Sequence, residues 1–123
     1  MNIRSFKDLE VWQLSMELVV NTYQLTSRLP DSERYGLISQ MQRSAVSIPS
    51  NIAEGSKRSS RADFRQFCLV ALGSAAELET QILLVQRLYS KNEVTNMLEE
   101  IVQIQKMLSS LAKRLNEKPP TKN

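Results

Sequence analysis

Four basic side chains gather just after the most interrupted part of the chain. The stretch Ser47–Phe64 reads SIPSNIAEGSKRSSRADF, in which a proline and a glycine break an otherwise helical pattern. The cations in and directly after this stretch are offset only by Asp63 and comprise Lys57, Arg58, Arg61 and Arg65. Guanidinium and ammonium groups at this density can bind phosphates, and such binding weakens steeply with salt. The cluster therefore predicts a nucleic-acid or anion site. The simpler alternative is a solvated corner, with Arg65 paired to a local carboxylate.

The residue types that carry most acid–base and metal chemistry are missing. The chain has no histidine, and Cys68 is its only cysteine. This removes the commonest general base, the usual nucleophile pairs and the usual zinc sites. Di-iron sites in helical bundles use Glu-x-x-His motifs, so Glu54, Glu77 and Glu79 are not expected to hold a metal. We expect no catalytic residues, no metal and no cofactor. We also expect Cys68 to be a buried thiol and Glu77 to contact Arg43.

The polar residues beside the cluster are expected to serve the structure. Pro49 lies inside a helical pattern that continues to Ile52, so it predicts a kink rather than a stop. Asn51 and Glu54 would then brace the end of that helix. Gly55 would close it in the left-handed conformation that glycine adopts most easily.

Apolar residues recur every three or four positions in four segments, which predicts four long helices. They span about residues 6–29, 33–54, 60–89 and 93–116, in a single domain of residues 1–116 followed by a flexible tail, 117–123. The expected N-terminal caps include Ser5, Ser59 or Ser60, and Asn92. Small residues predict that the second and third helices cross closely near Ser44 and Ala75.

The first helix carries two neighbouring apolar stripes, which is wider than a small isolated bundle needs. One stripe contains Trp12 and Tyr23, and we expect core packing for both aromatic rings. The second stripe would stay partly exposed in a monomer, which is compatible with an oligomer. Tyr35 precedes the second helix and is expected to be partly exposed. The aromatic residues do not interleave with the basic cluster, which counts against recognition of single strands by stacking.

Composition and loop length complete the fold prediction. The chain has 123 residues, only three glycines and a formal net charge of +3. No apolar run approaches twenty residues, so we expect no membrane partner, and the N-terminus lacks the apolar region of a secretory signal. We therefore expect a cytoplasmic protein. Four long helices joined by short loops predict an all-α, antiparallel up-down-up-down four-helix bundle.

Three longer segments of the sequence resemble the bacterial four helix bundle protein family, whose members are also called large-subunit rRNA intervening-sequence proteins. The segments are FKDLEVWQLSMEL, LPDSERYGLISQMQRSAVSIPSNIAEG and DFRQFCLVALGSAAELE, so that the resemblance covers roughly residues 6–115. It implies a left-handed bundle and a homo-oligomer, a pentamer as in solved relatives, with no enzymatic activity. A related group serves diversity-generating retroelements, which implies RNA or DNA and a reverse transcriptase as partners.

The residue pattern and the family resemblance together favour a non-enzymatic module that binds nucleic acid, with structured RNA as the favoured ligand. Phosphate contacts would come from the basic cluster, while Asn51, Glu54 and Gly55 form a structural polar motif. The alternative is a protein-interaction scaffold that does not bind nucleic acid. Binding to phosphates would fall steeply with salt, whereas an apolar protein interface would be nearly indifferent to it.

Overall fold

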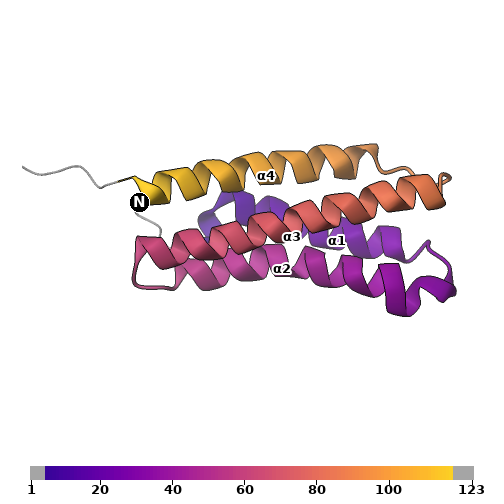
Figure 1. The fold of residues 1–123 in the computed structure, drawn as a ribbon, viewed down its shortest axis with the longest axis horizontal. Coiled ribbons are helices and arrows are strands. Elements are labelled where there is room, and N and C mark those ends of the chain that lie inside the picture. Colours follow the sequence, from indigo (N-terminus) through magenta and orange to yellow (C-terminus); the bar gives the residue numbers. More distant parts are fainter. Residues whose placement is uncertain (1–4, 118–123) are drawn as a thin grey trace, which may run out of the picture.

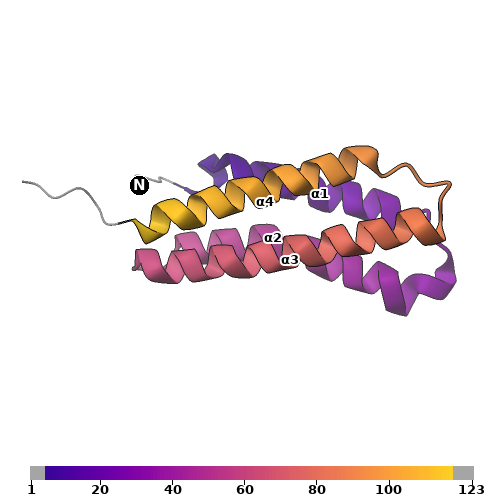
Figure 2. The ribbon, with the colours of Figure 1, turned by 45° about the horizontal axis from the view of Figure 1, so that its top comes forward.

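Four α-helices account for most of the chain (Figure 1, Figure 2). The computed structural model describes residues 5–117, and the predicted tail lies outside this range except for Glu117. The helices are α1 (Glu10–Thr26), α2 (Ser39–Ser56), α3 (Arg61–Leu88) and α4 (Thr95–Asn116). No strand occurs within the described residues. The predicted all-α class is therefore confirmed.

Successive helices run in opposite directions, as the colour gradient in Figure 1 shows. Hydrogen bonds between helix ends agree with this topology. The Gln42 amide, early in α2, donates to Thr26 at the end of α1, and Arg61 at the start of α3 donates to the Arg114 carbonyl near the end of α4. Each helix packs against its neighbours in sequence, and α4 packs against α1. The four helices thus close a ring of neighbours in which the α1/α2 face lies opposite the α3/α4 face.

The first helix begins later than the periodicity predicts. Ser5 is a cap as expected, but its hydroxyl accepts a hydrogen bond from the Lys7 N–H and caps only a 3-10 turn, η1 (Phe6–Asp8). Leu9 then has extended backbone angles, φ −75° and ψ 122°, which separate this turn from α1. The expected continuous helix from residue 6 is therefore divided in two, although apolar spacing alone cannot reveal the break.

The connection between α1 and α2 consists largely of two short helical segments that are not α-helical. It contains a 3-10 turn, η2 (Asp31–Glu33), and a π-helical segment, η3 (Arg34–Ile38), before α2 begins. Gly36 has non-helical angles within η3. The Tyr89 hydroxyl at the end of α3 donates a 2.6 Å hydrogen bond to the Glu33 carboxylate, which raises the pKa of Tyr89. This bond ties the α1–α2 connection to the α3–α4 connection.

The core takes the second predicted stripe on α1, so the expectation that this stripe stays partly exposed in a monomer is wrong. The members of this stripe are Val11, Leu14, Leu18, Leu25 and Leu29. Val11, Leu18 and Leu25 are buried, with Ser15 and Thr22 between them. The hydroxyls of Ser15 and Thr22 avoid an unsatisfied buried group because each donates to the carbonyl one turn earlier.

The other stripe lies at the edge of the core: Leu9, Trp12 and Val19 are partly buried and pack against it, as expected for Trp12, whereas Met16 and Tyr23 are exposed. Trp12 is half-buried and contacts Phe6 edge to face, with ring centroids 5.3 Å apart. Tyr23 is 46% exposed, so its predicted core position is wrong. Two stripes of similar composition compete for one core, and which of them is buried depends on where the neighbouring helices lie.

The closest helix pair is α2 with α3, as the small residues predict. Ser44 and Ala75 are both buried, and the Ser47 and Ser74 hydroxyls lie 2.8 Å apart across the two helices. Helix α2 continues through Pro49 without a stop. The lost backbone donor is tolerated there because the helix on both sides of it is held by packing.

Helices α3 and α4 differ in how well their starts are predicted. Ser60 caps α3 by accepting a hydrogen bond from the Asp63 N–H, which decides between the two expected serines. Asn92 does not cap α4, because its side chain donates back to the Tyr89 carbonyl. Val94 occupies the cap position without a capping side chain, and the Glu93 carboxylate before it accepts a 2.6 Å hydrogen bond from the Thr95 N–H, which lowers the Glu93 pKa.

Helix α3 is long and apolar enough to cross a bilayer by length and composition alone. In this structure it lies between α2 and α4 and turns a stripe of fully buried residues toward the core, which includes Cys68, Ala71, Ala75, Leu78, Ile82 and Val85. The core helix of a bundle passes the same test of length and composition. The handedness of the bundle stays a prediction.

Candidate nucleic-acid interface

The basic cluster lies at the corner where α2 ends and α3 begins. Arg58 has two local partners there: its guanidinium is 3.0 Å from the Glu54 carboxylate and 4.9 Å from the centre of the Phe67 ring. The side chains of Arg58 and Glu54 are about half exposed, so this ion pair is weak and can exchange partners. Lys57 lies over the Phe6 ring at 5.9 Å. The aromatic rings thus hold two cations at the surface.

Arg61 binds the end of another helix. Its guanidinium donates to the Arg114 carbonyl at 2.6 Å and to the Glu117 carbonyl at 3.4 Å. These carbonyls lie at the C-terminus of α4, where the helix dipole favours a positive charge. Arg61 therefore fastens α4 to the corner and brings a second helix to the basic cluster.

Arg65 lies one turn further along α3 and is partly buried. The only ion pair within residues 5–117 is that of Arg58 with Glu54, so the expected carboxylate partner of Arg65 is absent from this range. Its Nε atom is buried without a hydrogen-bond partner among these residues. The structure thus brings Lys57, Arg58 and Arg61 together around one corner and leaves Arg65 at its edge.

The polar motif at the end of α2 forms a network toward α3 and does not close the helix. The Asn51 amide donates to the Ser47 carbonyl at 2.8 Å and to the Ser47 hydroxyl at 2.9 Å. That hydroxyl also meets Ser74 of α3. Asn51 therefore orients a contact between helices, whereas Glu54 serves as the partner of Arg58.

The predicted left-handed conformation of Gly55 is wrong. Gly55 lies inside α2, which ends at Ser56, and no glycine in the chain has a positive φ. Glycine is needed here for space: a Cβ atom at this position would lie 2.6 Å from the Cβ of Phe67 and 3.0 Å from the Phe64 ring. The residue permits close approach of α2 and α3 directly below the basic corner.

The remaining candidates for chemistry have ordinary structural surroundings. Cys68 is buried, and burial raises the pKa of its thiol to about 11. Glu77 accepts a 3.4 Å hydrogen bond from Gln81, and the expected contact with Arg43 is not formed. No group of three or more metal-binding side chains comes together within residues 5–117. Tyr35 is 90% exposed, which confirms and exceeds the prediction for it.

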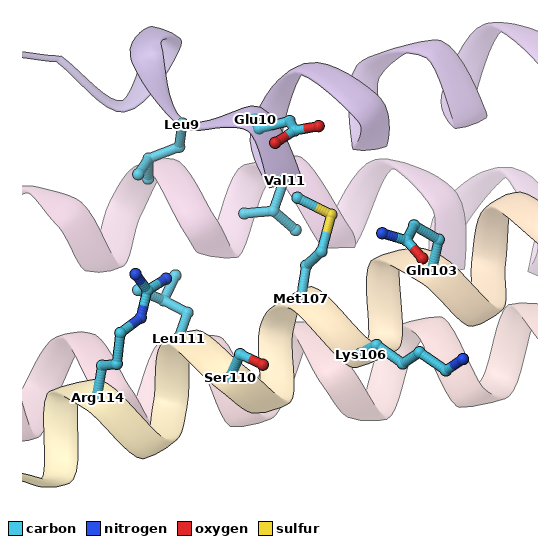
Figure 3. A pocket seen from close by; sticks show the side chains of 9 residues that line it. All are labelled: Leu9, Glu10, Val11, Gln103, Lys106, Met107, Ser110, Leu111 and Arg114. Atoms are coloured by element: carbon cyan, nitrogen blue, oxygen red, sulfur yellow. The ribbon is translucent and has the colours of Figure 1, made fainter.

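A groove between α1 and α4 adjoins the corner, and sequence reasoning missed it (Figure 3). Its volume is about 340 Å³, and its wall on α4 includes Lys106, Ser110 and Arg114. These residues are four apart, which places them on one helix face. That spacing was readable in the sequence, and the predicted up-down-up-down bundle places the first helix beside the last, but no pattern in the sequence indicated a groove between them.

Comparison with known proteins identifies the family. A family model described as 23S rRNA-intervening sequence protein matches residues 7–110. The chain belongs to this family. A crystal structure from Bacteroides thetaiotaomicron, of a protein of unknown function in the S23 ribosomal protein family, is 29% identical in sequence. The TM-score is 0.76, and the match covers 84% of this chain and 98% of that one. A search of curated proteins finds no match.

Proposed function

We propose that this member of the 23S rRNA-intervening sequence protein family is a non-catalytic, cytoplasmic accessory protein that binds structured RNA. The observation that carries this proposal is the corner of Lys57, Arg58, Arg61 and Arg65. Between residues 54 and 65, four cations face two carboxylates, those of Glu54 and Asp63, which leaves a local charge of 4 − 2 = +2. The family's association with 23S rRNA intervening sequences supports RNA as the ligand.

The partners that these cations already have do not prevent phosphate binding. An exposed ion pair such as that of Arg58 with Glu54 contributes roughly 0–1 kcal/mol, so a phosphate can replace the carboxylate at little cost. Phe6 and Phe67 reduce the entropy lost on binding because they hold Lys57 and Arg58 in place. One guanidinium nitrogen of Arg61 donates to the carbonyls of α4, and the other N–H groups of this side chain can donate to a ligand.

The protein is also proposed to act as a homo-oligomer, with the pentamer that the resemblance implies. Two apolar faces on opposite sides of the bundle support self-association. The α1/α2 face has a groove of about 360 Å³ whose lining contains no charged residue and includes Trp12, Met16, Val19 and Val46. The α3/α4 face includes Leu72, Leu98 and Val102, and it is bordered by Glu79, Glu99 and Lys106, the last of which also lines the groove between α1 and α4. A pentamer would repeat the basic corner five times and carry 5 × 3 = +15 formal charges.

Titration of a labelled RNA hairpin, followed by fluorescence anisotropy across a salt series, tests the proposed function. The logarithm of the binding constant should fall linearly with the logarithm of salt concentration. The double variant Lys57→Gln/Arg58→Gln should lower the slope by about 1.4–1.8, since each phosphate contact contributes about 0.7–0.9. The matched control is Arg87→Gln/Lys91→Gln, which removes the same charge at the other end of the bundle.

Two results would contradict the proposal. Wild-type protein that does not bind RNA at low salt would reduce the corner to a solvated turn. An equal loss in the control variant would show that only net charge matters. The substitutions avoid Arg61, because losing its bonds to α4 would change the fold as well as the charge.

A protein scaffold is the second candidate, favoured by the uncharged α1/α2 groove. If that groove binds a different protein, the affinity should hardly change with salt. A reverse transcriptase is the partner class implied by the resemblance. Binding that is insensitive to salt and lost in Met16→Glu, with no RNA binding, would favour this function over the first.

A further inference from the structure

The groove between α1 and α4 carries two exposed cations on its α4 wall. Lys106 and Arg114 are exposed, and neither forms an ion pair with residues 5–117. They lie eight residues apart on one face of α4, which corresponds to about 12 Å along the helix. Ser110 lies between them and adds a hydroxyl to the same wall. Figure 3 shows the Arg114 guanidinium extending from α4 toward the start of α1 at Leu9.

This row of polar groups is continuous with the basic corner. Arg61 donates to the carbonyl of Arg114, so the two arginines belong to adjoining helix ends. The order along the surface is therefore the corner, then Arg114, Ser110 and Lys106. The sequence separates these two parts by about fifty residues, and only the return of α4 alongside α3 joins them.

The floor of the groove is apolar, and its wall on α1 carries a negative charge. Val11 and Leu111 are buried at the floor, and Leu9 and Met107 are partly exposed beside them. Apolar groups of this kind can pack against the face of an unpaired base, whereas a paired helix has its bases stacked and offers only their edges in the shallow minor groove. Glu10 stands on the α1 wall and would repel a nearby phosphate.

We propose that the RNA-binding surface continues from the corner along this groove, where an unpaired strand of a structured RNA lies with Arg114 and Lys106 on different phosphates. This inference rests on the proposed function and extends its site. The two positions are about 12 Å apart along α4, and Figure 3 shows the head groups of Arg114 and Lys106 extending in different directions, so we assign them to different phosphates. Glu10 limits the affinity of the groove.

Anisotropy with two labelled RNAs tests the inference: a hairpin with a single-stranded 3′ extension and a blunt duplex of equal phosphate number. Arg114→Gln/Lys106→Gln should lower the salt slope by about 1.4–1.8 on the extended hairpin and much less on the duplex. Glu10→Gln should raise affinity for the extended hairpin. The side chain of Lys113 is exposed and lies outside the groove lining, so Lys113→Gln is the control and should have a smaller effect.

Each alternative outcome can be assigned. If the groove variants bind as wild type does while Lys57→Gln/Arg58→Gln loses affinity, the groove proposal is overturned and the corner stands. Equal losses per charge in Lys113→Gln overturn it too, because they indicate general attraction. Wild-type protein that binds neither RNA overturns both proposals. Arg114→Lys keeps the charge and should retain the slope, and circular dichroism checks that every variant is helical.

Discussion

At the scale of single residues, Gly55 and Gly73 both lie inside helices but differ in the space around them. A Cβ at Gly55 would meet the Cβ of Phe67 at 2.6 Å, whereas a Cβ at Gly73 would meet nothing within 4 Å. The first glycine is therefore required by packing. The second weakens its helix without any steric reason within the monomer.

Gly55→Ala is expected to destabilise the protein, because α2 and α3 must move apart to admit the methyl group. We expect a net loss of about 1–2 kcal/mol, the cost of overpacking reduced by the better helix propensity of alanine. Gly73→Ala is the matched control and should raise stability by about 0.5–1 kcal/mol. Urea denaturation followed by circular dichroism measures both, and a stabilised Gly55→Ala would contradict the packing argument.

The basic residues show how far single positions could be predicted. The cluster itself was visible because its members are close in sequence. Their partners were not, since Arg61 binds carbonyls at Arg114 and Glu117, more than fifty residues away. The local carboxylate expected for Arg65 was assigned from nearness in sequence, which does not fix the direction of a side chain on a helix.

At the scale of helices, the start of α3 sets the position of the whole corner. Ser60 has extended backbone angles, φ −115° and ψ 149°, and its hydroxyl accepts the N–H of Asp63. This is the usual geometry of an N-terminal cap, and it fixes where Arg61 leaves the helix.

Ser60→Ala should destabilise the protein by about 0.5–2 kcal/mol, as the loss of such a cap usually does. Ser59→Ala is the control and should have almost no effect, because Ser59 lies outside the helix and is not its cap. Thermal unfolding of the two variants side by side gives the comparison. Equal losses would show that the cap is not the source of the effect.

Periodicity predicted four helices and placed most of their ends within a few residues, since long amphipathic patterns are hard to mistake. It failed at Leu9 and in the segment Arg34–Ile38, where the backbone changes conformation while the apolar spacing continues. It also could not choose between the two stripes of α1. That choice is made by α2 and α4, which cover Leu18 and leave Tyr23 exposed.

At the scale of the whole molecule, the bundle presents apolar faces on opposite sides. Met16 and Val46 are about 40% exposed on the α1/α2 face. Leu83 is similarly exposed and lies one turn after Glu79, whose carboxylate accepts a hydrogen bond from Gln105 of α4. If the α1/α2 face of one copy packs against the α3/α4 face of the next, both apolar faces are covered. Contacts of this kind close into a ring when the rotation between neighbouring copies permits it.

Met16→Glu and Leu83→Glu test this arrangement together. Each variant alone should be a monomer, because every contact in its oligomer would include an altered face. An equal mixture should form dimers, since one intact face of each kind is then present. Light scattering measures the mass of each sample. Variants that keep the mass of the wild type, or a mixture that stays monomeric, would contradict contacts between unlike faces.

The groove between α1 and α4 also shows that the first and last helices have neighbouring ends. Leu9 and Arg114 line the same groove, so the first helix starts beside the place where the last one finishes. A short linker could therefore join the two ends, and new ends could be opened in the exposed connection around Lys91. Such a circular permutant would keep every helix contact while its linker crossed the groove. The order of the helices in the sequence can thus change without changing the fold, but such a change alters access to the groove between the start of α1 and the end of α4.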